Sequence, residues 1–169
     1  MAAMSTFITY PDPRLSEAAT AQPVDAALRA IGQRLLAAGT EAKAYGLAAA
    51  HIGEVAPIAL VSISEPDERD YRLLYNPTVV SSAQEQEIGT EGSVSLPGIE
   101  VDVLRARAVE ITFDDENGIR HTLSLSGFAA RVAQHEIDQV NGIFFLSRVS
   151  RLKRDAALKR FAKLGRRAG

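Results

Sequence analysis

The sequence predicts a single domain of the α+β class. Apolar residues recur at helical spacing near both ends of the chain, strand-like runs fill its middle, and an Asn-Gly turn joins two alternating strands. Because helices and strands are grouped rather than alternating, this order favours α+β over a βαβ sheet. The 169 residues, 46% of them hydrophobic, are enough to bury a full core, so we expect one domain over residues 1–169.

The first predicted helix covers about residues 25–40. Apolar residues from Val24 to Leu35 recur at helical spacing, and Asp25 stands near the start, where the helix dipole favours a carboxylate. The next segment, "YGLAAAHIG", is rich in glycine and other small residues. It therefore indicates an irregular loop with close backbone approaches.

Strands are predicted in the middle of the chain. "APIALVSIS" is an apolar, β-branched run typical of a buried strand, and "YRLLYNPTVV" indicates a second strand, interrupted by the turn-prone Asn76–Pro77 pair. "ARAVEITFDDENGIRHTLSLSG" predicts a hairpin, because two alternating strands flank Asn117–Gly118, a pair suited to a tight turn.

Two more helices are predicted towards the C-terminus. "FAARVAQHEIDQVNG" carries apolar residues at helical spacing from Phe128 to Val140 and ends at a helix stop, Asn141–Gly142. The last stretch, about 148–166, alternates apolar and basic residues at helical spacing and predicts an amphipathic, basic helix.

The net charge of −2 hides an asymmetry along the chain. Before Arg148 there are 10 Lys/Arg against 20 Asp/Glu, and from Arg148 onward there are 9 Lys/Arg against Asp155 alone. A basic tail on an acidic body indicates either an anionic partner such as RNA or a solvated helix face.

Several classes of protein are disfavoured by what the sequence lacks. There is no cysteine, hence no disulfide and no thiolate metal ligand. No apolar run reaches membrane-span length, and residues 1–15 lack a basic region followed by an apolar core, so we expect a cytoplasmic protein without a membrane partner. Without a phosphate-binding glycine loop or a basic surface interleaved with aromatics, sequence-specific nucleic-acid binding is not expected.

The stretch "QHEIDQVNG" is a near match to a metal-binding helix. In His-Glu-x-x-His, two imidazoles one helical turn apart hold one Zn²⁺ or Fe²⁺. His135 and Glu136 are present, but Gln139 stands where the second histidine belongs.

Three stretches in this order resemble the signature motifs of the peptide deformylase family. "AYGLAAAHIG" (44–53) is similar to Gly-x-Gly-Leu-Ala-Ala-x-Gln, "EGSVSLPG" (91–98) to Glu-Gly-Cys-Leu-Ser, and "QHEIDQVNG" (134–142) to Gln-His-Glu-x-Asp-His-x-x-Gly. The flanking "YPDPRL" and "YNP" match as well. The resemblance implies a mixed α+β fold with the third-motif helix packed against the sheets, and removal of the formyl group from the starting methionine of new bacterial proteins.

The resemblance also implies roles for residues. The family holds a divalent metal, Fe or Zn, through the second-motif cysteine and the two histidines, while the helix glutamate is the general acid/base. Carried onto this chain, the metal positions are Ser93, His135 and Gln139, and the catalytic positions are Glu136, His51 and the backbone N–H of Val94. The substrate-binding positions are Gly46, Leu47, Ala48, Gly92 and Ser95.

The departures from the family pattern fall on the reactive positions. Ser93 replaces the metal-binding cysteine, Gln139 replaces the second histidine, and His51 replaces the glutamine that binds the oxyanion, while Ala44 replaces the first glycine. A protonated hydroxyl and a neutral amide are weak ligands for a divalent first-row metal. A catalytic zinc site typically has about three protein ligands, so ordinary deformylation is not expected, and the cofactor is either the family's metal or none.

Several functions stay open at this point. The chain can be a module that binds formylated or other peptide N-termini, with the basic helix docked on the ribosome as in the family. It can be an active hydrolase with a rebuilt metal site of His51, His135 and Glu136. It can also use Ser93 as a nucleophile, with His135 as base and Glu136 as its orienter, or keep residual deformylase activity.

A purely structural interpretation of the same residues is also open. His135, Glu136, Gln139 and Ser93 can form a buried polar group that stabilises the fold. His51 can be a hydrogen-bonded loop histidine. Glu91 and Arg105 are expected to form a salt bridge near the cleft.

Overall fold

The computed structural model describes residues 7–168, so the two ends of the predicted domain, residues 1–6 and Gly169, lie outside it. Within the described residues the helices are α1 (Ala26–Ala42), α2 (Gly127–Val140) and α3 (Arg151–Ala168). Short 3₁₀ turns are η1 (Pro13–Ser16), η2 (Ala49–Ile52) and η3 (Phe145–Arg148). None of the described helices is both long and apolar enough to cross a membrane.

The strands form two antiparallel sheets. The larger has the order β1-β2-β3-β6-β7, and the smaller is the β4-β5 hairpin. Their bounds are β1 (Gly46–Ala48), β2 (Ile58–Ser62), β3 (Tyr71–Ser82), β4 (Gln86–Gly92), β5 (Glu100–Ala106), β6 (Ala108–Asp114) and β7 (Arg120–Ser126). The mixture of helices and antiparallel sheets confirms the predicted α+β class.

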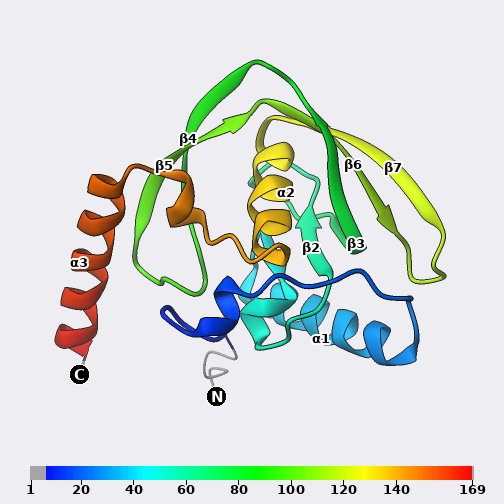
Figure 1. The fold of residues 1–169 in the computed structure, drawn as a ribbon, viewed down its shortest axis with the longest axis horizontal. Helices are drawn as coiled ribbons and strands as arrows, with labels where there is room; N and C mark the ends of the chain where they lie inside the picture. The colour runs from blue at the N-terminus through cyan, green and yellow to red at the C-terminus, as the bar shows by residue number, and fades with distance from the viewer. Residues whose placement is uncertain (1–6, 169) are drawn as a thin grey trace.

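Helix α2 lies between the two sheets and is the element that both pack against (Figure 1). Its Val132, Ala133 and Ile137 enter a core with residues of the large sheet such as Val61 and Ile111. Ten of its 14 residues are buried, including charged ones, so any polar side chain on this helix must find a partner inside the protein.

The first helix follows its sequence signals closely. The Asp25 side chain accepts a hydrogen bond from the N–H of Leu28 (2.9 Å), which caps the helix start. Leu28 and Leu35 are buried, as their spacing predicted. The helix ends at Ala42 and is capped by Lys43, whose backbone is left-handed (φ 53°).

The predicted loop "YGLAAAHIG" is wrong, because this segment contains strand β1 and turn η2. A side chain at Gly46 would lie 2.7 Å from Val132 Cγ1 and 2.9 Å from the carbonyl oxygen of Leu60. The small residues therefore bring β1 against β2 and α2 rather than breaking the structure. The predicted interruption at Asn76 is a bulge with positive φ (49°) inside the continuous strand β3.

The β4-β5 hairpin was not predicted at all. Its inward face carries Glu91 and Arg105, both buried, beside apolar Val101 and Val103. Charged residues on the buried face conceal the alternation of polar and apolar residues that marks a strand. The β6-β7 hairpin, by contrast, was predicted from Asn117–Gly118 and is confirmed.

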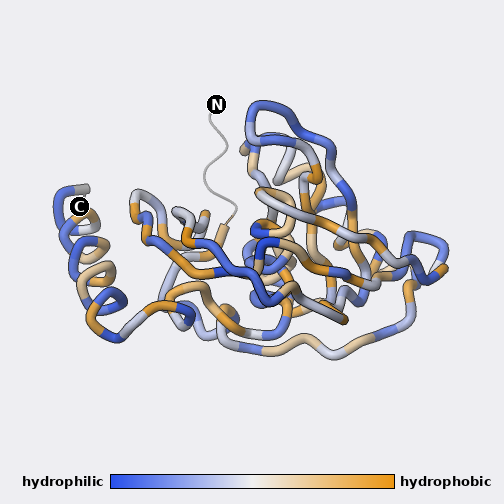
Figure 2. The backbone as a smooth tube through the Cα atoms, turned by 90° about the horizontal axis from the view of Figure 1, so that it is seen from above, coloured by the Kyte–Doolittle hydropathy of each residue, from blue (hydrophilic) through white to orange (hydrophobic). Residues whose placement is uncertain are grey.

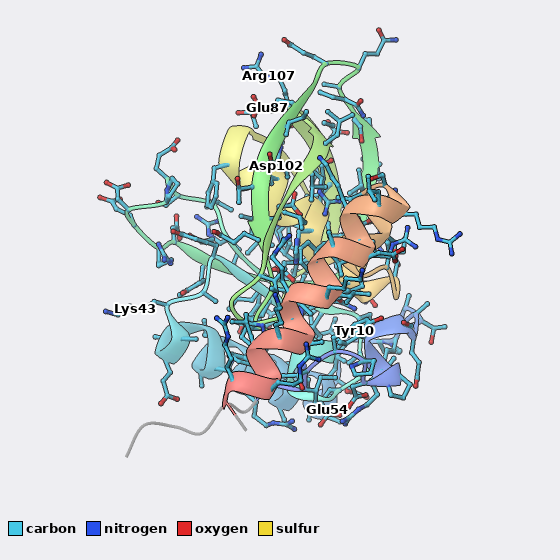
Figure 3. The ribbon with its side chains drawn as sticks, turned by 90° about the vertical axis from the view of Figure 1, so that its left-hand side faces the viewer. Tyr10, Lys43, Glu54, Glu87, Asp102 and Arg107 are labelled. Carbon is cyan, nitrogen blue, oxygen red and sulfur yellow. The ribbon has the colours of Figure 1, made fainter. Side chains whose placement is uncertain are left out.

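Helix α3 stands at the outer side of the β4-β5 hairpin (Figures 1 and 3). It begins at Arg151 rather than near 148, because Arg148 belongs to η3. Ala157 is fully buried, and Leu158 and Phe161 pack in the same core as Val101. The tube of this helix alternates between hydrophilic and hydrophobic residues (Figure 2), which is the predicted amphipathic pattern. Its anionic partner stays a prediction.

Figure 3 also labels three exposed charged residues of the hairpin and its end, Glu87, Asp102 and Arg107. Asp102 accepts a hydrogen bond from Thr90 (2.9 Å), and Arg107 pairs with Glu87 at 3.5 Å. An exposed ion pair such as Arg107–Glu87 contributes little to stability.

Replacing Gly46 by alanine tests the close packing of β1. We expect Gly46→Ala to lower the free energy of unfolding by about 1–3 kcal/mol, because the new methyl group overpacks against α2 and β2. Gly165→Ala is the matched control: no atom lies within 4 Å of its added methyl group, and helix propensity favours alanine. Chemical denaturation of both variants measures this, and equal effects would contradict the packing argument.

Candidate functional site

A cleft of about 350 Å³ opens where α2, β1 and the β4-β5 hairpin meet. One wall comes from residues 43–46, which lead into β1, and the opposite wall from residues 90–94, which end β4. His51, His135 and Glu136 line the same cleft, together with Glu100, Phe128, Arg131 and Val132. The three predicted motifs therefore converge on one cavity.

A buried carboxylate organises the side of this cleft formed by β4. Glu91 accepts hydrogen bonds from Arg105 Nε and Nη2 (both 2.9 Å), from Arg131 Nη1 (2.7 Å), and from His135 Nδ1 (2.8 Å). Burial acts to raise the pKa of Glu91, but the hydrogen bonds from Arg105 and His135 outweigh it and lower the pKa to about 2. The expected Glu91–Arg105 salt bridge is confirmed.

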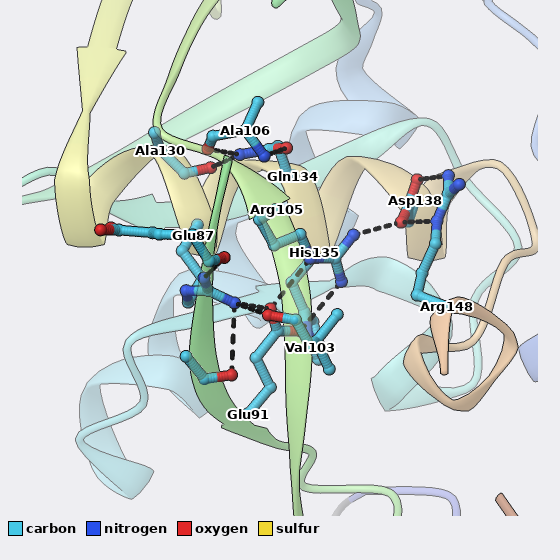
Figure 4. A network of polar contacts seen from close by, with 12 residues as sticks. Glu87, Glu91, Val103, Arg105, Ala106, Ala130, Gln134, His135, Asp138 and Arg148 are labelled. Carbon is cyan, nitrogen blue, oxygen red and sulfur yellow. Dashed lines mark hydrogen bonds and ion pairs between the residues drawn. The ribbon is translucent and has the colours of Figure 1, made fainter. Parts of the chain in front are cut away.

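The network continues away from the cleft (Figure 4). Arg105 Nη1 donates to Asp138 Oδ2 (2.6 Å), and Asp138 accepts two hydrogen bonds from Arg148 (2.9 and 2.7 Å). Strand β4, strand β5, helix α2 and turn η3 are thereby joined by one chain of ion pairs.

His135 is held by this network rather than free to turn. Since Glu91 is ionised, the Nδ1–H of His135 donates to it, and the ring also packs on Phe145 with centroids 5.3 Å apart. Burial lowers the pKa of His135, but the carboxylates of Glu136 and Glu91 outweigh that effect and raise it above its usual value.

Glu136 and His51 form the least satisfied part of the cleft. Oε1 of Glu136 and Nε2 of His51 are both buried without a hydrogen-bond partner. Burial raises the pKa of Glu136 to about 7 and lowers that of His51 to about 3. The gap between Glu136 Oε1 and His51 Nδ1 is 3.7 Å, too long for a hydrogen bond.

The second motif presents its backbone and one hydroxyl to the cleft. Ser93 Oγ accepts a hydrogen bond from the N–H of Ser95 (3.1 Å), and Ser93, Val94 and Gly92 line the cavity. Ser95 is fully buried and is not among the lining residues; its carbonyl accepts from Tyr10 N–H (2.8 Å). Leu47 and Ala48 are fully buried behind the wall, whereas Gly46 lines it.

Gln139 lies outside the cleft. Its Nε2 donates to the carbonyl oxygen of Leu15 (2.7 Å), and the side chain is only 1% exposed. The residue at the second histidine position therefore ties α2 to the N-terminal turn η1 instead of facing His135 and Ser93.

The residues at the implied metal positions do not fit the family's metal. A thiolate is replaced by a neutral hydroxyl that already accepts a backbone N–H, and an imidazole is replaced by an amide whose nitrogen donates to Leu15 and whose neutral oxygen is a weak ligand. His51 Nδ1 accepts from Ala48 N–H (2.9 Å), so it has no free lone pair either. Among residues 7–168, no cluster of three His, Asp or Glu side chains has the grouping that a metal ion needs.

The sequence reasoning missed Arg131, which crosses from α2 to the hairpin. It donates to Glu91, to Val103 O (2.8 Å) and to Glu87 O (2.8 Å). The sequence does carry a signal for this residue, because Arg131, His135 and Gln139 recur at i, i+4 spacing along one face of the helix.

Known proteins similar to this chain agree with the fold and the motifs. A family model described as polypeptide deformylase matches residues 4–155. Rhizobium meliloti (strain 1021) has two relatives: a peptide deformylase, 32% identical over 164 residues (96% of this chain, 94% of that one), and a peptide deformylase-like protein, 35% identical over 165 residues (97% and 95%). The crystal structure of peptide deformylase from Ehrlichia chaffeensis superposes with a TM-score of 0.86 at 29% identity, covering 96% of this chain and 97% of that one.

Replacing one residue of the ion-pair chain tests how much the chain contributes to the stability of the fold. We expect Arg105→Met to cost about 3–5 kcal/mol of unfolding free energy, because it leaves the buried Glu91 carboxylate short of two hydrogen bonds. Arg72→Met removes an exposed pair with Asp70 and should cost less than about 1 kcal/mol. Urea denaturation compares the free energies of unfolding of the two variants. A similar loss in both would contradict a stabilising role for the buried network.

The network also predicts a pH dependence of stability. The pKa of Glu91 falls from 4.5 to about 2 on folding, so its contribution is complete above about pH 4.5 and is lost as the pH drops towards 2. We therefore expect the stability difference between the wild type and Glu91→Gln to narrow as the pH is lowered through that window. A difference that stays constant there would contradict the assignment.

Proposed function

Since the chain belongs to the polypeptide deformylase family, we propose that it binds peptide N-termini in the cleft without the family's metal-dependent hydrolysis. The observation that carries the proposal is the placement of Gln139. Its amide nitrogen donates to Leu15, and the side chain is not among those that line the cavity, so the second imidazole of the family's metal set has no counterpart in the lining. The cleft keeps the two walls formed by the first and second motifs, and its floor is formed by His51, His135 and Glu136.

The walls suit an extended peptide. Strand β1 is the edge of the large sheet, and β4 has a free edge in the two-stranded sheet. Residues of both strands line the cleft, so two unpaired strand edges flank it. A peptide backbone can pair with such an edge, which supplies affinity through main-chain hydrogen bonds.

The floor supplies donors rather than a Lewis acid. His51 accepts from Ala48 N–H at Nδ1, so its neutral ring carries the proton at Nε2, which can donate to a peptide carbonyl oxygen. This retains the donor role of the family's glutamine with a different side chain. The backbone N–H of Val94 lies in the same cavity wall.

Metal content and peptide binding, measured together, test this function. We expect iron, zinc, nickel and cobalt far below one atom per chain, measurable calorimetric binding of Met-Ala-Ser or formyl-Met-Ala-Ser, and no release of formate. The double variant Ser93→Cys, Gln139→His restores a thiolate and a second imidazole, and is the positive control for metal uptake.

Other outcomes would point to the remaining functions. A stoichiometric metal that is lost in His51→Ala would replace the proposal with a rebuilt metal site. Formate released without metal and abolished by Ser93→Ala would indicate a serine nucleophile. Failure to bind either peptide would end the proposal altogether.

A further inference from the structure

The floor of the cleft holds a pair of buried polar atoms with opposite requirements. Glu136 is 5% exposed and His51 1% exposed, and neither Glu136 Oε1 nor His51 Nε2 has a hydrogen-bond partner. A buried polar atom left without a partner costs free energy, so a bound group that satisfies both atoms gains affinity. Both side chains line the cavity, so that group can come from a ligand in the cleft.

The hydrogen bonds already present fix what each atom needs. Ala48 N–H occupies Nδ1 of His51, so Nε2 carries a proton and needs an acceptor. Oε1 of Glu136 needs a donor. A ligand that matches the floor therefore presents a donor beside an acceptor, as the amino group and first carbonyl of a peptide do.

The charges in the cleft distinguish a free peptide N-terminus from a formylated one. Glu91, the other carboxylate deep in this cleft, is saturated by Arg105, Arg131 and His135. Lys43 and Glu100, also in the lining, are exposed. Glu136 is thus the buried carboxylate of the lining with an open oxygen. Although burial raises its pKa to about 7, a cationic donor stabilises the ionised form and satisfies it better than a neutral amide N–H does.

We propose that the cleft selects a free α-ammonium peptide terminus over a formylated one, with the ammonium at Glu136 and the following carbonyl oxygen at His51 Nε2. This inference rests on the proposed function and names its ligand class. The apolar side chains of Val94, Phe128 and Val132 in the same lining suit an apolar first residue. The preference reverses what the resemblance alone implied, because a formyl group removes the charge that Glu136 recognises.

One peptide with three different N-termini, free, formylated and acetylated, tests the preference in the wild-type protein. Calorimetry would compare Met-Ala-Ser, formyl-Met-Ala-Ser and acetyl-Met-Ala-Ser, all as C-terminal amides. We expect the free peptide to bind at least about tenfold more tightly than either capped one, as a charge-assisted hydrogen bond at a buried carboxylate provides. Equal or tighter binding of the formylated peptide would overturn this inference but leave the proposed function standing; no binding of any peptide would end both.

Single substitutions test whether Glu136 is responsible for the preference for a free N-terminus. In Glu136→Gln we expect the advantage of the free peptide to disappear, whereas Glu110→Gln, which removes an exposed carboxylate on β6 outside the cleft, should leave it intact. If Glu136→Gln is folded by circular dichroism and keeps the full preference, the assignment to Glu136 is wrong. The wild-type comparison is decisive even if that variant does not fold.

Discussion

The carboxylate of Glu91 is the constraint on which the cleft depends. Buried between β4 and α2, it accepts hydrogen bonds from Arg105, Arg131 and His135, and each donor comes from a different place in the chain. A buried charge that lost one of these partners would be strongly destabilising. The carboxylate therefore fixes β4, β5 and α2 relative to one another, and the walls of the cleft follow from that arrangement.

This dependence explains how a family fold can persist while its reactive positions change. Ion pairs from Arg131 to Glu91 and from Arg105 to Asp138 hold the hairpin to α2. Gln139 has taken up a structural task, the hydrogen bond to Leu15 that holds η1 against α2. Ser93 retains its place in the wall but binds backbone.

Local patterns predicted what local physics determines. Helix α1, the β6-β7 hairpin and helix α2 were predicted because spacing, a capping aspartate and an Asn-Gly turn act within a few residues. The β4-β5 hairpin was missed because Glu91 and Arg105 occupy its buried face, and only their mutual pairing makes that face tolerable.

The motif residues lie together, but the orientation of their side chains was not predicted. His51, Ser93, His135 and Glu136 all line one cavity, and their roles there stay a prediction. The direction of Gln139 could not be predicted, since its partner Leu15 lies 124 residues away in the sequence. The saturation of Glu91 was equally hidden, because Arg131 and Arg105 reach it from two separate elements.

We propose that this cleft holds a peptide terminus and no metal. Native mass spectrometry of protein purified without oxygen, with Met-Ala-Ser added, tests it in one spectrum. We expect a species with the mass of the chain plus one peptide and without the added mass of a metal ion. A chain that carries one iron or zinc ion and retains it when the peptide leaves would contradict the account.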